Sequence, residues 1–279
     1  MANIHPTALV DASATVDESA RIGPFSIVGP GVAIGPRTVL HNHVVIHSLT
    51  TIGADNEIFP FSVIGADPQD LKFEGEIATC EIGDRNTIRE HVTIHRGTAN
   101  GGGVTRLGDG NLIMVAAHVA HDCLIENEVI IANQVMLAGH VRIGSAANIG
   151  GGAGVHHFAT VGKCAFVGAL SRISKDVPPF MIVEGNPAEV RAINAIAMTR
   201  RGYCQEHIEA MKDAFKRLYR DNGAPMAEKM QRLRTEYADV PAIIELCDSL
   251  VATGDGIFGR AQEIDRPHDK RAIAQAQPG

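Results

Sequence analysis

Two histidines and a carboxylate stand close together in "HVAHDC" (residues 118–123), as His118, His121 and Asp122. An imidazole can act as a general base near neutral pH, and a neighbouring carboxylate can fix its tautomer and stabilise the imidazolium. The same residue types can bind zinc. Asp122 could equally be a turn residue that bonds its own backbone. The chemistry therefore depends on where the backbone directs each side chain.

The backbone pattern is a repeat of six residues. An aliphatic residue recurs at every sixth position through residues 4–64, 82–94 and 107–173, at all 26 positions. Helices and ordinary strands have side-chain periods of 3.6 and 2, so neither explains this pattern. A coil does, if each hexad is one short strand plus a corner and about 18 residues complete a triangular turn. Glycine often follows the aliphatic residue, as at Gly23 and Gly144, and we expect these glycines to supply permissive backbone angles at the corners.

The hexad pattern resembles the hexapeptide-repeat proteins, whose fold is a left-handed parallel β-helix. The resemblance, not the period, implies the handedness. We expect an all-β coil over residues 1–187, followed by an α-helical C-terminal domain over 188–258 and a polar tail over 259–279. Charged residues and proline interrupt the repeat at residues 66–81, and a second interruption at residues 95–106 contains three consecutive glycines. These interruptions predict two loops that leave the coil. Ile208, Met211 and Leu218 have helical spacing.

Composition narrows the functional classes. The formal net charge of −7 argues against a non-specific surface for nucleic acid or anionic membranes. The five cysteines are an odd number without a CxxC pair, which is typical of reduced thiols in a cytosol. The chain starts without the basic and apolar segments of a signal peptide, and no segment is long enough to span a membrane. We therefore expect a cytoplasmic protein.

The hexad phase also separates inward from outward side chains. Cys123 occupies an inward position, whereas His121 points outward. With about 18 residues per turn, His118, His121, His140 and His156 should gather on one side of adjacent coils. Such a cluster favours zinc binding or acid–base chemistry. Hexapeptide-repeat proteins include γ-class carbonic anhydrases, which bind zinc with three histidines between subunits, but an extended groove of histidines favours the acid–base interpretation.

Six runs extend the resemblance to one family, the UDP-N-acetylglucosamine O-acyltransferases of lipid A biosynthesis. They are "QDLKF" (69–73), "EIGDRNTIREHVTIHRGT" (81–98), "HVAHDC" (118–123), "LAGHV" (137–141), "DVPPF" (176–180) and "TRRGY" (199–203). The resemblance implies transfer of an (R)-3-hydroxyacyl group from acyl carrier protein to the 3-hydroxyl of UDP-N-acetylglucosamine. It implies no metal and no dissociable cofactor, because the carrier's own prosthetic group bears the donor. It also implies a homotrimer whose sites lie between neighbouring chains.

The resemblance assigns roles motif by motif. His121 matches the general base, Asp122 the group that orients it, and the backbone N–H of Gly139 the oxyanion donor. The residues that match substrate contacts are His118, His140 and His156 on the coil, Asp70 and Lys72 at the sugar and acyl-donor end, and Arg200 and Arg201 at the nucleotide end, where guanidinium groups could grip a diphosphate.

Three positions depart from the family pattern. His157 stands where glutamine is common, and Ile196 where a glutamate often precedes the arginine pair, which puts the nucleotide contacts and the choice between a 3-hydroxyl and a 3-amino sugar in question. Ala169 stands at the family's acyl-length position, where a methyl group should trim the groove relative to glycine. The alternatives are a relative that N-acylates a later glucosamine intermediate, a zinc enzyme of the carbonic anhydrase type and a non-catalytic binding solenoid. The N-acylating relative usually carries an extra N-terminal domain.

Overall fold

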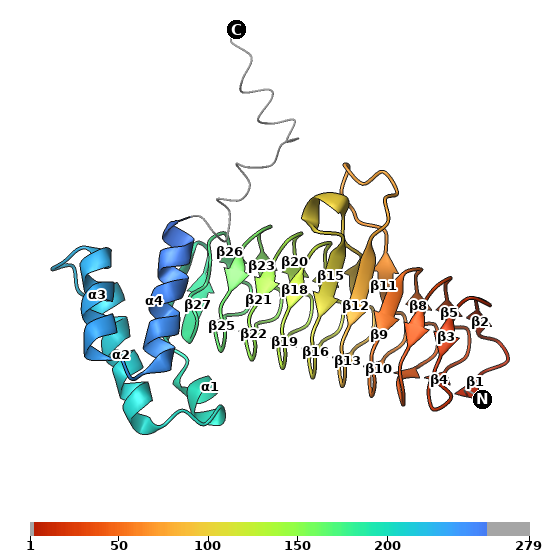
Figure 1. The fold of residues 1–279 in the computed structure, drawn as a ribbon, viewed down its shortest axis with the longest axis horizontal. Helices are drawn as coiled ribbons and strands as arrows, with labels where there is room; N and C mark the ends of the chain where they lie inside the picture. Colours follow the sequence, from red (N-terminus) through yellow and green to blue (C-terminus); the bar gives the residue numbers. More distant parts are fainter. Residues whose placement is uncertain (1–2, 256–279) are drawn as a thin grey trace, which may run out of the picture.

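The chain folds into a left-handed parallel β-helix followed by a helical domain (Figure 1). The computed structural model describes residues 3–255, so the tail expected at 259–279 lies outside the described residues. The predicted fold class is confirmed. Among the described residues, no helix has the length and apolar character needed to cross a membrane.

Three sheets, here called A, B and C, form the sides of the prism. Sheet A contains β1 (Asn3–Ile4), β4 (Arg21–Ile22), β7 (Val39–Leu40), β10 (Glu57–Ile58), β13 (Thr87–Ile88), β16 (Leu112–Ile113), β19 (Ile130–Ile131), β22 (Asn148–Ile149), β25 (Phe166–Val167), β27 (Met181–Gly185) and β28 (Ala188–Ile193). Sheet B contains β2 (Leu9–Val10), β5 (Ile27–Val28), β8 (Val45–Ile46), β11 (Val63–Ala66), β14 (Thr93–His95), β17 (His118–Val119), β20 (Met136–Leu137), β23 (Gly154–Val155) and β26 (Arg172–Ile173). Sheet C contains β3 (Thr15–Val16), β6 (Ala33–Ile34), β9 (Thr50–Ile52), β12 (Thr79–Ile82), β15 (Val104–Leu107), β18 (Leu124–Ile125), β21 (Arg142–Ile143) and β24 (Thr160–Val161).

The aliphatic residue of each hexad forms the core. Strands of successive coils pair in parallel and in register, so that Ile58 lies beside Ile88 and Ile88 beside Ile113. From residue 22 onward, every aliphatic hexad position is at most 3% exposed. The first three positions, in the coil that has no neighbour on one side, are not fully buried. One stacked column per sheet therefore replaces the aromatic core of an ordinary globular domain.

The corners of the coil do not depend on glycine for their backbone angles, although the sequence pattern predicted that they would. Positive φ recurs every six residues, but mostly at other residue types, such as Phe25 (59°), His43 (57°) and Phe61 (64°). Gly23 and Gly144 are not among the positive-φ residues, so their predicted role at strained corners was wrong. A Cβ on Gly23 would lie 2.6 Å from the carbonyl group of His41, and one on Gly144 would lie 2.6 Å from the nitrogen of Lys163. These glycines are needed because successive coils approach closely.

Both predicted loops leave the coil at the edge between sheets B and C, here called the B–C edge, and project from the same side of the prism (Figure 1). The first excursion covers residues 67–78, and the second covers 96–103 and includes the 3₁₀ turn η1 (Ala99–Gly101). The predicted boundaries, 66–81 and 95–106, were too wide. Residues 79–81 and 104–106 belong to β12 and β15, which pair with each other, because their backbone groups continue the ladder and Cys80 fits the narrow interior.

The coil ends in an antiparallel hairpin of β27 and β28 at one end of sheet A. The prediction that residue 188 begins a helical domain was therefore wrong for residues 188–193, whose alternating burial is typical of a strand. The helices are α1 (Ala195–Arg200), α2 (Gln205–Tyr219), α3 (Met226–Glu236) and α4 (Pro241–Gly254). Ile208, Met211 and Leu218 are buried on α2, as their spacing predicted.

Candidate active site

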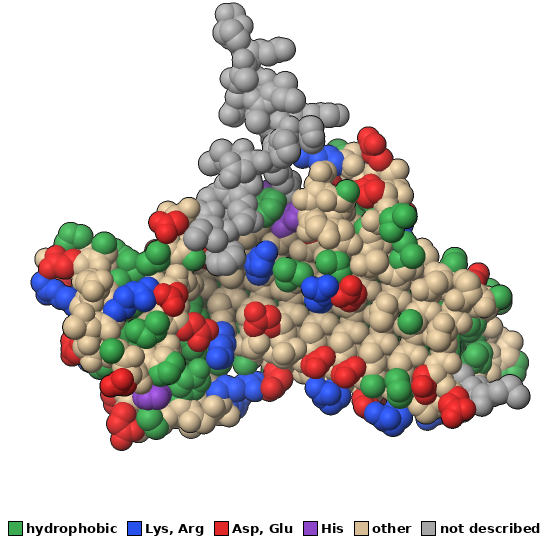
Figure 2. All heavy atoms as spheres, viewed as in Figure 1, with side chains coloured by type: hydrophobic (Ala, Val, Ile, Leu, Met, Phe, Trp, Pro, Cys, Tyr) green, Lys and Arg blue, Asp and Glu red, His purple; other side chains and the backbone are tan. Residues whose placement is uncertain are grey.

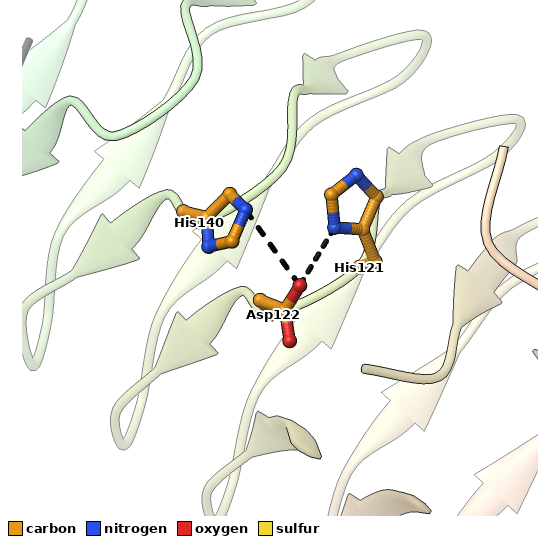
Figure 3. Close-up of side chains that lie close together, drawn as sticks. All are labelled: His121, Asp122 and His140. Atoms are coloured by element: carbon orange, nitrogen blue, oxygen red, sulfur yellow. Dashed lines mark hydrogen bonds and ion pairs between the residues drawn. The ribbon is translucent and has the colours of Figure 1, made fainter. Parts of the chain in front are cut away.

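Stacking of successive coils brings His121, Asp122 and His140 together at the B–C edge (Figure 3). Asp122 and His140 occupy the same positive-φ corner position one coil apart, with φ of 60° and 62°. His140 Nε2 lies 3.7 Å from Asp122 Oδ2. On its other side His140 stacks on Phe158, with 4.4 Å between the ring centroids. The corner geometry of the repeat thus places two imidazoles around one carboxylate.

His121 and Asp122 form a hydrogen-bonded dyad. His121 Nδ1 lies 2.7 Å from Asp122 Oδ2, and a proton on Nδ1 leaves the lone pair of Nε2 available as a base. The Asp122 side chain is completely buried. Burial alone raises the pKa of this carboxyl group, but the hydrogen bonds from His121 and Thr98 and the charge of His140 outweigh it, so the pKa lies below its usual value. Asp122 is therefore an anion at neutral pH.

Gly139 lies directly beside the His121 ring. A Cβ at residue 139 would be 2.5 Å from Cε1 and 2.7 Å from Nε2 of His121. Within the described residues, the N–H of Gly139 has no hydrogen-bond acceptor. Proline occupies the equivalent position of other hexads, as at Pro24 and Pro30, because the ladder needs no donor there. The N–H next to the dyad is thus free to bind a ligand oxygen.

A second pair of histidines lies on sheet B beside the dyad, with His118 on β17 and His95 on the neighbouring β14. His118 Nδ1 is 2.7 Å from Thr93 Oγ1, and its ring meets His95 edge-on with 4.9 Å between centroids. Burial and then repulsion from His121 lower the pKa of His118. Burial, His118 and His121 lower the pKa of His95 to about 4. Sequence analysis missed His95, although it follows its hexad aliphatic residue as His156 does.

A groove runs along the outer face of sheet B beside this cluster. Its volume is about 430 Å³, and its lining includes His118, Met136, Gly154, His156 and Arg172. Gly154 pairs with Met136 and Arg172 on the neighbouring coils, so the groove has a floor without a side chain. His156 Nδ1 lies 3.2 Å from the carbonyl oxygen of His157. In the space-filling view, histidine side chains lie in the hollow beside the excursions (Figure 2).

Comparison with known proteins identifies the family. The family described as "Udp N-acetylglucosamine O-acyltransferase; Domain 2" matches residues 176–258, and the family described as "Bacterial transferase hexapeptide (six repeats)" matches residues 2–48. The acyl-[acyl-carrier-protein]–UDP-N-acetylglucosamine O-acyltransferase of Paracidovorax citrulli is 50% identical over 208 residues, 74% of this chain and 79% of the relative. The enzyme of that name from Verminephrobacter eiseniae is 48% identical over 220 residues, 79% of this chain and 84% of the relative. The solved UDP-N-acetylglucosamine O-acyltransferase of Moraxella catarrhalis superposes with a TM-score of 0.87 at 43% identity, over 90% of this chain and 97% of that one.

The chain belongs to the UDP-N-acetylglucosamine O-acyltransferase family. The family resemblance inferred from the six sequence runs is therefore confirmed. The repeat and the helical domain are parts of one acyltransferase fold, which makes a non-catalytic solenoid and a carbonic anhydrase the weaker interpretations.

The remaining predicted site residues of this acyltransferase fold lie on the first excursion, at the edge between sheets A and B, and at the end of α1. Asp70 and Lys72 are on the first excursion, where the Lys72 N–H donates to Asp70 Oδ1 at 3.1 Å. Lys72 also lines a hollow of about 720 Å³ between the two excursions. Ala169 is exposed at the edge between sheets A and B. The width of sheet B thus separates Ala169 from His121 within one chain, whereas Asp70 and Lys72 lie on the excursion that leaves at the edge carrying the dyad.

The arginine pair lies near the third edge of the prism. Arg200 ends α1 and Arg201 caps it, and both are exposed. Arg201 forms an ion pair with Glu128, which lies between β18 and β19 at the edge between sheets C and A. The whole width of sheet C separates Glu128 from Asp122. A single chain therefore does not bring the arginine pair to the dyad.

The donor atoms of His121, Asp122 and His140 lie within 4.8 Å of one another. Two imidazoles and a carboxylate match a three-ligand zinc site in kind, but zinc would need each donor at about 2.0–2.2 Å. Asp122 Oδ2 already accepts hydrogen bonds from His121 and Thr98. The arrangement is thus an internally bonded dyad with a second histidine beside it.

Proposed function

We propose that the chain transfers an (R)-3-hydroxyacyl group from acyl carrier protein to the 3-hydroxyl of UDP-N-acetylglucosamine, in lipid A biosynthesis, with His121 as the general base. Membership of the family supports the reaction. The observation that supports the base is the 2.7 Å contact between His121 Nδ1 and the buried Asp122 carboxylate, because it leaves His121 Nε2 to accept a proton.

The dyad can perform the reaction in two steps. The sugar oxygen attacks the thioester carbonyl carbon while His121 Nε2 takes the hydroxyl proton, and Asp122 stabilises the resulting imidazolium. The N–H of Gly139 donates to the oxyanion of the tetrahedral intermediate. When the intermediate collapses, the carbon–sulfur bond breaks and the departing thiolate of the carrier takes the proton from His121. No metal or dissociable cofactor is needed for this balance.

The groove on sheet B is suited to an acyl chain. Met136 and the side-chain-free floor at Gly154 give it an apolar centre, His118 lies at its end on the coil of the dyad, and His156 lies beside it after β23. Ala169 limits the length of the chain, because its methyl group occupies space that glycine would leave open. His118, His140 and His156 contact the substrates as donors and acceptors.

The complete site is built by more than one copy of the chain, as a homotrimer. Arg200 and Arg201 at the nucleotide end lie away from the dyad of their own chain, whereas Asp70 and Lys72 at the sugar and acyl-donor end lie on the first excursion, at the edge that carries the dyad. Large apolar side chains are exposed on sheet B and its edge with sheet A, among them Phe25 at 57%. Exposed apolar surface of this kind marks an interface.

An acyl-transfer assay with UDP-N-acetylglucosamine and a series of 3-hydroxyacyl carrier proteins tests this function. We expect transfer by the wild type and a loss of activity of at least about 10³-fold in His121→Ala. The control His5→Ala, on the exposed first coil, should keep the wild-type activity. Full activity of His121→Ala would refute the general base. No transfer with any donor would favour a binding solenoid, and stoichiometric zinc in the active protein would favour the metal interpretation.

A further inference from the structure

The second excursion contributes Thr98 to the site, a residue to which the sequence motifs gave no role. We propose that Thr98 is a positioning residue, which fixes the orientation of the Asp122 carboxylate and thereby sets the base strength of His121. The inference rests on the proposed function for its kinetic consequences. It rests on the geometry of the dyad alone for its effect on His121.

Thr98 binds both oxygens of the carboxylate. Its backbone N–H donates to Asp122 Oδ1 at 2.8 Å, and its hydroxyl donates to Oδ2 at 2.7 Å. Thr98 is 2% exposed. With His121 on Oδ2 as well, neither oxygen can exchange places with the other without losing a hydrogen bond to a charged group. The carboxylate therefore has one orientation.

The backbone of Gly101 covers the same carboxylate. A Cβ at this position would lie 1.9 Å from Cγ and 2.2 Å from each oxygen of Asp122, so only glycine permits the approach. Gly102 and Gly103 follow with φ of 94° and 79°, which turn the chain back towards β15. The run of three glycines thus serves to close the excursion over Asp122 and exclude water from it.

The first excursion holds the second in place. Glu76 accepts a hydrogen bond from the N–H of Ala99 at 3.1 Å and another from the N–H of Glu74 at 2.9 Å. Both excursions leave at the B–C edge, one coil apart. The first excursion thus fixes the residue next to Thr98, so the position of Thr98 does not depend on its hydrogen bonds to Asp122 alone.

Removal of the Thr98 hydroxyl has a distinct chemical effect. Asp122 Oδ2 would lose a donor that shares its negative charge, so it would bind the protonated form of His121 more strongly and raise the pKa of His121. When the pKa of a general base rises, the base is protonated at a higher pH, so the acidic limb of the pH profile of kcat/KM moves to higher pH. A purely structural defect would not move that limb.

The test uses the full chain with Thr98→Val, Thr98→Ser and Thr38→Val. Thr38 is a buried control, because its hydroxyl donates to the carbonyl of Gly53 at 2.7 Å and accepts from the N–H of Asn56 at 3.1 Å in coils away from the dyad. We expect Thr98→Val to lower kcat/KM about tenfold at neutral pH and to move the acidic limb up by about half a pH unit. Thr98→Ser should restore both values, and Thr38→Val should lower the melting temperature without moving the limb.

Direct titration of the His121 imidazole by NMR, assigned with His121→Gln, provides a readout that needs no acyl transfer. We expect its pKa to rise in Thr98→Val and to return in Thr98→Ser. An unchanged His121 pKa, or a loss of activity equal at every pH and accompanied by the same fall in melting temperature as in Thr38→Val, would overturn the proposal. If the wild type transferred no acyl group but the His121 pKa still rose, the proposed function would fail while the positioning role stood.

Discussion

Asp122→Asn is a nearly isosteric change whose effect can be worked out from the hydrogen bonds of the dyad. The backbone N–H of Thr98 donates to Oδ1 and cannot become an acceptor, so the amide oxygen of the new asparagine must take the Oδ1 position. Its NH₂ group then takes the Oδ2 position, 2.7 Å from Nδ1 of His121 in the wild type. An NH₂ group facing Nδ1 requires the tautomer that carries the proton on Nε2.

His121 in that tautomer cannot accept the proton of the sugar hydroxyl. A change of tautomer in a related histidine–carboxylate arrangement lowers kcat on the order of 10⁴-fold, so we expect a loss of roughly 10³–10⁴-fold in kcat for Asp122→Asn. Size and shape hardly change, so the melting temperature should change far less than that loss suggests. Asp122→Ala should be no more harmful than Asp122→Asn, although it removes more atoms.

The assay is acyl transfer at saturating UDP-N-acetylglucosamine, with circular dichroism and thermal unfolding on the same samples. Matched measurements of Asp122→Asn and Asp122→Ala separate the tautomer effect from the loss of packing. Retention of more than about a tenth of the wild-type kcat by Asp122→Asn would show that the orientation of the imidazole is not set by this carboxylate.

Three further predictions concern other residues of the site. Gly139→Ala should lower kcat about 10²-fold in steady-state assays, because the new methyl group would displace the His121 ring; a normal kcat would contradict the close packing. His95→Gln should reduce the acid sensitivity of folding. Because the folded pKa of His95, about 4, is below the usual 6.5, the unfolded chain binds more protons and stability falls as pH drops from 6.5 to 4, by up to roughly 3 kcal/mol. Urea unfolding at pH 7 and pH 4.5 measures the free energy of unfolding at each pH, and an equal loss of that free energy in the wild type and in His95→Gln would refute this prediction. Ala169→Gly should shift the preferred donor towards a longer acyl chain in a series of carriers, and an unchanged preference would remove Ala169 from that role.

The fold could be predicted because the hexad pattern is local and nearly free of exceptions. One inward side chain per strand decides which residues face the axis, and the stacking of coils follows from it. The same phase placed His140 near Asp122, since both fall at the same corner. The limits of the excursions could not be predicted, because β12 and β15 pair across about 25 residues and their register depends on how the loop between them returns.

Thr98 escaped prediction for a related reason. The repeat fixes the positions of side chains on the coil, whereas the path of residues 96–103 depends on contacts with Glu76 and Asp122 that the period does not contain. The role of the corner glycines was misjudged in a similar way. Their need for close approach between coils becomes visible only when the distance to the next coil is known.

The distribution of the predicted site residues over the prism leads to a last prediction. Asp122 lies at the B–C edge, and Arg201 is bound to Glu128 across the width of sheet C. If each site combines His121 of one chain with Arg201 of its neighbour, a mixture of His121→Ala and Arg201→Ala chains must contain sites in which both residues are intact.

For random exchange at equal amounts, both chains that contribute to a site have the needed residue in about a quarter of the sites of a closed ring. Each variant alone should be nearly inactive at substrate concentrations below KM, and mixing after dissociation and reassembly should restore about a quarter of the wild-type rate. His121→Ala mixed with Asp122→Asn is the control, because both changes fall on the same chain's dyad and no mixture can repair it. If the first mixture stays as inactive as the control, the arginine pair does not serve a neighbour's dyad, and the nucleotide must be bound by other residues.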